Sequence, residues 1–71
     1  MFKNEYRKQV WMVQKRDTEF EAQNKIEAGY PELVERDWKD VLVKPTWGKR
    51  ASWHANDMKS KFTETRIVKV A

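Results

Sequence analysis

The chain has 71 residues, no cysteine, one histidine and a formal net charge of +4. This length accommodates a single domain, residues 1–71, and the lack of cysteine excludes disulfides and cysteine-based zinc sites. No apolar run is long enough to cross a membrane and no apolar leader follows Met1, so we expect a cytoplasmic protein without a membrane partner. Without a disulfide or a zinc site, the domain depends for its stability on the packing of its four Trp, two Tyr and three Phe residues, or on association with another molecule.

Charge is distributed unevenly along the chain. Residues 1–16 carry five cations and one acid, residues 17–43 carry three cations and eight acids, and residues 44–71 carry seven cations and two acids. The chain is therefore basic at both ends and acidic in the middle, a pattern that concerns partners and electrostatic steering more than fold. The alternative is a mixed-charge surface that only keeps a small domain soluble.

The first predicted element is a strand at about residues 6–15. Its centre, Val10-Trp11-Met12-Val13, is a continuous β-branched and aromatic stretch between polar residues. A helix is the alternative, because apolar residues also recur at helical spacing from Phe2 to Val13.

A helix is predicted next, at about residues 18–28. Thr18 and Glu21 have the spacing of a capping box, and the residues that follow are good helix formers. Gly29 stands where a left-handed cap ends a helix, and Pro31 prevents continuation.

Residues 32–44 fit two structures. Val34, Trp38 and Val41 share a helix face, but Val41-Leu42-Val43 before Pro45 also fits a buried strand at 40–44. We favour a helical turn at 31–36 followed by that strand. Trp38 is expected in the core under either interpretation.

The last third of the chain begins with a predicted loop at residues 45–61, which contains a short strand or helix at 50–55. Residues 63–70 are rich in Thr, Ile and Val and predict a final strand. The predicted fold class is therefore α+β: a small sheet of two to four strands with the helix at 18–28 packed on one face. The other face is then either a cationic, partly aromatic platform or an ordinary solvated surface.

No catalytic motif stands out in the sequence. The two glycines are isolated, which excludes a glycine-rich phosphate loop, and neither serine has the flanking glycines of a nucleophile elbow. If residues 50–55 form a strand, Ser52 and His54 share a face, with Asp57 as a candidate orienting carboxylate; the alternative is an ordinary surface histidine. We expect no enzyme activity, no cofactor and no metal site.

The most informative stretch combines cations with aromatic residues around a loop. Its candidate binding residues are Lys44, Trp47, Lys49, Arg50, Trp53 and His54. Such cations neutralise phosphates, and exposed aromatics stack on bases at about 1–3 kcal/mol per base. The same composition is typical of protein-binding hot spots. The third interpretation is that the two Trp residues belong to the core.

In size, tryptophan content and charge the chain resembles small accessory proteins of phages and mobile elements, a resemblance that assigns no role to any residue. We expect a non-enzymatic inhibitor or adaptor that binds a protein through the aromatic loop, the acidic middle or an exposed sheet edge. The alternatives are nucleic-acid or nucleoprotein binding through the basic, Trp-containing loop, and a homo-oligomer that buries its Trp residues between subunits. The modest net charge and the acidic middle favour the protein partner.

Overall fold

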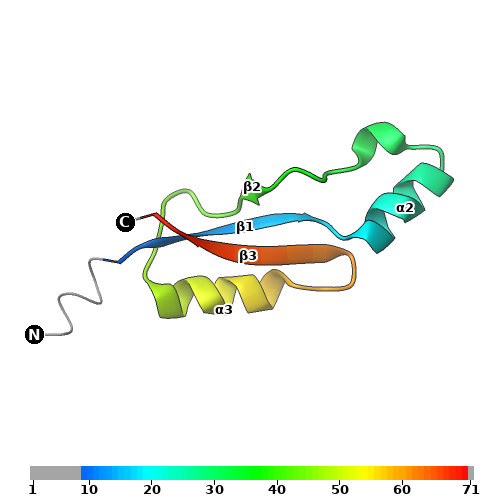
Figure 1. Cartoon of the computed structure of the whole chain (residues 1–71). Coiled ribbons are helices and arrows are strands. Elements are labelled where there is room, and N and C mark those ends of the chain that lie inside the picture. The colour runs from blue at the N-terminus through cyan, green and yellow to red at the C-terminus, as the bar shows by residue number, and fades with distance from the viewer. Residues whose placement is uncertain (1–8, 71) are drawn as a thin grey trace, which may run out of the picture.

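The computed structural model describes residues 9–70, which form a three-stranded antiparallel sheet with two α-helices and one 3₁₀ turn (Figure 1). In chain order the elements are β1 (Trp11–Asp17), α2 (Glu19–Glu27), the 3₁₀ turn η1 (Pro31–Leu33), β2 (Lys39–Asp40), α3 (Gly48–Met58) and β3 (Thr63–Lys69). The predicted α+β class with a small sheet is confirmed. Within residues 9–70, neither helix has the length or the hydropathy needed to span a bilayer.

The sheet is built around β1, which lies between β2 and β3. β1 and β3 pair along their whole length, from Trp11 opposite Lys69 to Asp17 opposite Thr63. β2 contributes only two residue pairs on the other side of β1. The sheet is therefore essentially one long ladder with a short third strand beside it.

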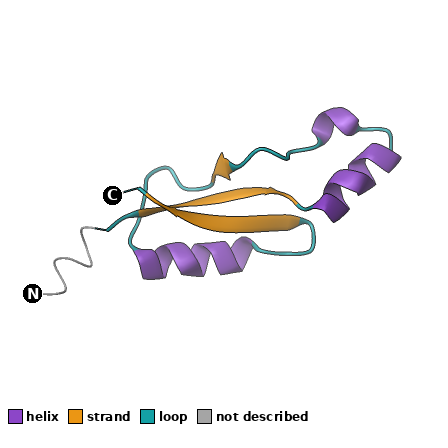
Figure 2. Cartoon of the chain, in the orientation of Figure 1, coloured by secondary structure: helices purple, strands orange, loops and turns teal. Residues whose placement is uncertain are grey.

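The helix α3 covers one face of this sheet and runs alongside β1 and β3 (Figure 2). Ala51 and Ala55 pack on Val13, which is fully buried, and Thr65 on β3 donates a hydrogen bond of 2.9 Å to the carbonyl of Ala55. At Gly48 a Cβ atom would lie 3.2 Å from Nε1 of the Trp11 indole. Small residues on one side of α3 thus let the helix approach the sheet closely.

The helix α2 has the ends that the sequence predicts. The Glu21 N–H donates to the Thr18 hydroxyl at 3.2 Å, and Gly29 has a φ of +91°, in the left-handed region that glycine adopts readily. However, α2 lies beyond the end of the sheet and does not pack on its face (Figure 1). Only Thr18 separates α2 from β1, so the helix cannot fold back over the strand that precedes it. The prediction that the helix at 18–28 covers the sheet is wrong, and α3 does so instead.

The other element boundaries differ from the predicted ones in several places, and the helical turn predicted at 31–36 is shortened to Pro31–Leu33. Residues 50–55 are helical, in the middle of α3, and are not a strand. The predicted strand at 40–44 is reduced to Lys39–Asp40, although the Val41 N–H still donates to the Val13 carbonyl at 2.9 Å. The strand predicted at 6–15 begins at Trp11 and continues to Asp17; its residues 6–8 lie outside the described part of the chain. The predicted last strand is present as β3.

The face of the sheet opposite α3 is open and polar, and Trp38 lies there, not in the core as predicted. The guanidinium carbons of Arg16 and Arg66 lie 4.3 and 4.4 Å from the centre of its indole ring. Gln14 on β1 donates to Asp40 on β2 at 2.9 Å and accepts from Arg66 on β3 at 2.8 Å. Apart from the buried Met12, cation–π contacts and cross-strand hydrogen bonds therefore occupy this face in place of a second apolar layer.

Candidate functional site

The predicted binding residues gather on and before α3, and the helix determines where each one points. Because Gly48, Ala51 and Ala55 face the sheet, Lys49 and Trp53 project away from it, and the other residues between them point to the two flanks of the helix. Lys49 and Trp53, four positions apart, form an outer ridge, and Trp53 has 63% of its surface exposed. Trp47 is the N-cap residue of α3 and is 43% exposed. The interpretation of these two Trp residues as buried core is therefore wrong.

Three of the predicted residues lie together on the flank of α3 that faces the preceding loop. Lys44, Arg50 and His54 line a shallow pocket of about 370 Å³. The rest of its lining is mostly apolar and consists of Leu42, Val43, Pro45 and Thr46. The His54 ring also meets the Trp53 indole edge-on, with 5.1 Å between ring centres. The pocket thus combines cationic groups with an apolar wall.

The cations of this surface are not neutralised within the described part of the chain. The ion pairs found there join Arg16 and Arg36 to Glu64, Lys25 to Asp17, and Lys39 to Glu35. None of them includes Lys44, Lys49 or Arg50, and the first turn of α3 has no acidic residue. The acids of α2 and η1 lie at the far end of the molecule (Figure 1). The surface is therefore locally cationic, although the middle of the chain is acidic.

The opposite flank of α3 forms a second groove, which the sequence did not reveal. It lies between α3 and β3 and has a volume of about 240 Å³. Its lining residues are Ser52, Ala55, Asn56, Lys59, Thr65, Arg66 and Ile67. Ser52 and His54 consequently line different flanks of the helix, because residues two apart on a helix do not face each other. The arrangement needed for a Ser52–His54 catalytic pair is absent.

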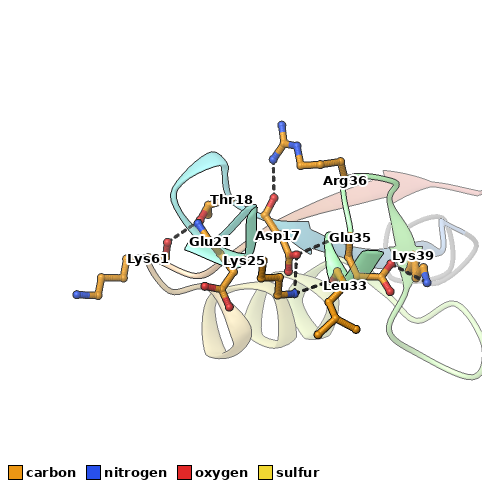
Figure 3. A network of polar contacts seen from close by, with 9 residues as sticks. All are labelled: Asp17, Thr18, Glu21, Lys25, Leu33, Glu35, Arg36, Lys39 and Lys61. Carbon is orange, nitrogen blue, oxygen red and sulfur yellow. Dashed lines mark hydrogen bonds and ion pairs between the residues drawn. The ribbon is translucent and has the colours of Figure 1, made fainter. Parts of the chain in front are cut away.

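A third polar region lies at the other end of β1, where Asp17 joins three elements (Figure 3). Its carboxylate accepts hydrogen bonds from Lys25 Nζ at 2.7 Å and from the Glu35 N–H at 2.8 Å. Lys25 Nζ also donates to the Leu33 carbonyl, and Arg36 donates to the Asp17 carbonyl. Burial by itself raises the pKa of Asp17, but the hydrogen bonds from Lys25 and Glu35, with the positive charges of Lys25 and Arg36, lower it overall.

This network also borders a pocket of about 370 Å³. Its walls carry the ion pairs of Asp17 with Lys25 and of Glu35 with Lys39. Because the other charged groups of the lining are ion-paired, Lys15 is the only one without an ion pair among the described residues. The region serves to attach α2 and η1 to the sheet.

The residues of α3 and its preceding loop are therefore the strongest candidate site. No three His, Asp or Glu side chains of residues 9–70 come together as a metal-binding group. Comparison with known proteins adds no further assignment, because no protein family, no curated protein and no solved structure matches this chain.

Proposed function

We propose that this domain is a non-enzymatic, cytoplasmic inhibitor or adaptor that binds another protein through the outer surface of α3. We call this the α3 surface; its residues are Lys44, Trp47, Lys49, Arg50, Trp53 and His54. The observation that carries the proposal is the exposed Trp53 indole beside cations that have no acidic partner in the described chain. Trp and Arg are the residues most enriched among binding hot spots.

Trp53 is suited to act as the anchor of such an interface. An aromatic side chain buries about 150–250 Å² when it is covered, and apolar burial is worth roughly 25 cal/mol per Å². Covering the exposed two thirds of this indole would therefore contribute about 2–4 kcal/mol, the range of a hot-spot residue. Because a helix supports Trp53, little conformational entropy of the backbone is lost on binding.

A nucleic acid is the second candidate partner, and one observation favours it. The acids of α2 and η1 lie at the far end of the molecule from the α3 surface (Figure 1), and Lys44, Lys49 and Arg50 have no ion pair among the described residues. With three cations available, binding to duplex DNA would show a log–log salt slope of about −3. The apolar wall of Leu42, Val43 and Pro45 next to Arg50 favours a protein, because phosphates gain nothing from it.

The test is affinity capture from a lysate by the tagged domain, with and without nuclease. Wild type is compared with Trp53→Ala and Arg50→Ala, and with Lys39→Ala as a control, since Lys39 is an exposed cation of β2 outside the α3 surface. We expect one protein at fixed stoichiometry that survives nuclease, is lost with the two α3 variants and is kept by the control. Recovery only of nuclease-sensitive, salt-sensitive material would replace the protein by a nucleic acid. Recovery unchanged by either α3 variant would place the interface elsewhere.

A further inference from the structure

The outer edge of β3 is a full-length strand edge without a partner among residues 9–70. The Val70 N–H donates to the Val10 carbonyl, so the even-numbered residues of β3 direct their backbone groups to β1. By the same alternation, the backbone N–H and C=O groups of Thr65, Ile67 and Lys69 point to the outer edge. Within the described part of the chain no strand pairs with this edge, whereas the opposite side of β1 is occupied by β2 and by the bridge between Trp11 and Thr46.

The groove beside this edge is positioned to receive the side chains of an added strand. Thr65 and Ile67 direct their side chains to the α3 face. There they line the groove together with Ser52 and Asn56 of α3 and with Lys59, which directly follows the helix. A strand laid along β3 would direct every second side chain into this groove. Backbone pairing along the edge, with a groove for alternate side chains, is the arrangement used in recognition by strand addition.

The charges along this edge favour an acidic occupant. Lys59 and Lys69 have no ion pair among the described residues, and the only acid of β3, Glu64, is held by Arg16 and Arg36 on the open face of the sheet. Edge lysines are a common defence against unwanted strand pairing. Here they also disfavour a second copy of the chain, because a second β3 strand would bring the same positive charges to the edge, and its one acid, Glu64, is already paired with Arg16 and Arg36.

From the free edge, the groove and the unpaired lysines, we propose that β3 takes an extended, acidic segment of the partner protein as a fourth strand of the sheet. This inference rests on the proposed function and adds the mode of binding and the chemistry of the partner. A polypeptide backbone satisfies the edge N–H and C=O groups, which nucleic acid cannot do in the same regular spacing.

The experiment uses a displayed library of random twelve-residue peptides, selected on the immobilised wild-type domain. We expect enrichment of proline-poor sequences in which Asp or Glu alternates with β-branched residues. Each selected peptide is then synthesised with N-methyl groups at one set of alternate residues or at the other. One set should weaken binding at least about tenfold, because it blocks the edge-facing N–H groups, and the other should not. This comparison needs no protein variant.

A protein variant provides the second test. Ile67→Pro removes an N–H that points away from β1 and should leave the sheet folded, whereas Val68→Pro removes a ladder hydrogen bond and should unfold it. We expect Ile67→Pro to retain its circular dichroism spectrum and to lose the selected peptides. No enrichment, enrichment without acidic residues, or equal effects of the two N-methyl sets would overturn the inference.

The outcomes also separate this inference from the proposed function. If Ile67→Pro still captures the partner protein while Trp53→Ala does not, the α3 surface is the interface and strand addition is wrong. If wild type forms a dimer in sedimentation velocity and Ile67→Pro does not, the occupant of the edge is a second copy and the acidic partner is wrong.

Discussion

The side chains on the two faces of β1 are stabilised by different kinds of contact. On one face Val13 has no exposed surface and lies under Ala51 and Ala55 of α3. On the other face its neighbour Gln14 forms a polar row with Asp40 and Arg66. Val13 and Gln14 are adjacent in the strand, but Val13 packs against a helix away from water, whereas Gln14 lies among cations, amides and an indole.

The difference shows how a very short chain completes a sheet with a single covering helix. A second apolar face would need a second helix over it, and α2, the only other α-helix of the described residues, lies beyond the end of the sheet (Figure 1). Arg16 and Arg66 stack on Trp38 instead, so that the indole is shielded without being buried. We infer that the covered face supplies most of the stability and that the open face holds the strands in register.

Overfilling the covered face should have the largest effect. Ala51 is fully buried between α3 and the sheet, so Ala51→Leu has no room for its added atoms and should cost about 3 kcal/mol. A domain of this size has roughly 3–5 kcal/mol of stability in total, so a large unfolded population is expected. Urea denaturation measures the loss, and the exposed neighbour Ser52→Leu is the matched control. A loss in Ala51→Leu no larger than in the control would mean that α3 is not packed on the sheet as described.

Removing the indole of the open face should have the next largest effect. Trp38→Ala loses two cation–π contacts and the partial burial of a large ring, and we expect about 2 kcal/mol of destabilisation. Trp53→Ala is the matched control, with an expected loss below about 0.5 kcal/mol because its indole is mostly in water. Equal losses in the two variants, measured by urea denaturation, would remove the distinction between a structural and a binding tryptophan.

The Asp17 network should make a smaller contribution that depends on pH. We expect Asp17→Asn to cost about 1 kcal/mol at pH 7, because a partly solvated ion pair with Lys25 is lost. Since folding lowers the pKa of Asp17, its contribution is complete above its unfolded pKa of about 3.9 and is lost as the pH falls through the lower folded value. The difference between wild type and variant should therefore shrink on acidification below pH 4. Glu35→Gln, which alters the more exposed ion pair with Lys39, is the control. If the stability difference between wild type and Asp17→Asn did not change with pH, it would not come from the ionised Asp17 carboxylate.

The smallest effect is expected for the polar row itself. Gln14→Ala removes two hydrogen bonds that are exposed to water and should cost about 0.5 kcal/mol. Gln23→Ala, an exposed glutamine on α2, is the control and should be neutral. A loss in Gln14→Ala as large as that in Trp38→Ala would show that the row stabilises the fold as well as setting the register.

The elements with local signals were predictable from the sequence, and those defined by packing were not. The Thr18 cap and the left-handed Gly29 bound α2 because both act within a few residues. Residues 50–55 fit either a strand or a helix in the sequence, because Trp47, the N-cap residue of α3, provides no side-chain cap and the sheet-facing residues of the helix are small. The sequence wrongly predicts Trp38 in the core, because no local pattern indicates that Arg16 and Arg66 will meet above its ring.

The candidate site was predictable in composition but not in geometry. Sequence alone pointed to Trp53 and Arg50 by their residue types, and whether they bind a partner stays a prediction. It could not separate the two flanks of α3, since that requires the helix itself. The sequence does not predict the groove at Asn56 and Lys59, because these are common surface residues and form a groove only through their position beside β3.

The ladder between β1 and β3 also has a consequence for how the domain folds. Gln14 and Arg66, which face each other across it, are 52 positions apart in the chain. Closing so long a loop is entropically costly, and folds dominated by such distant pairings form slowly, in roughly milliseconds to seconds. Until residues 63–69 have been synthesised, Trp11, Met12 and Val13 lack their long ladder with β3, and the apolar segment is only partly paired and prone to aggregation. The time between making the first strand and the third is therefore when this chain is most exposed to misassembly.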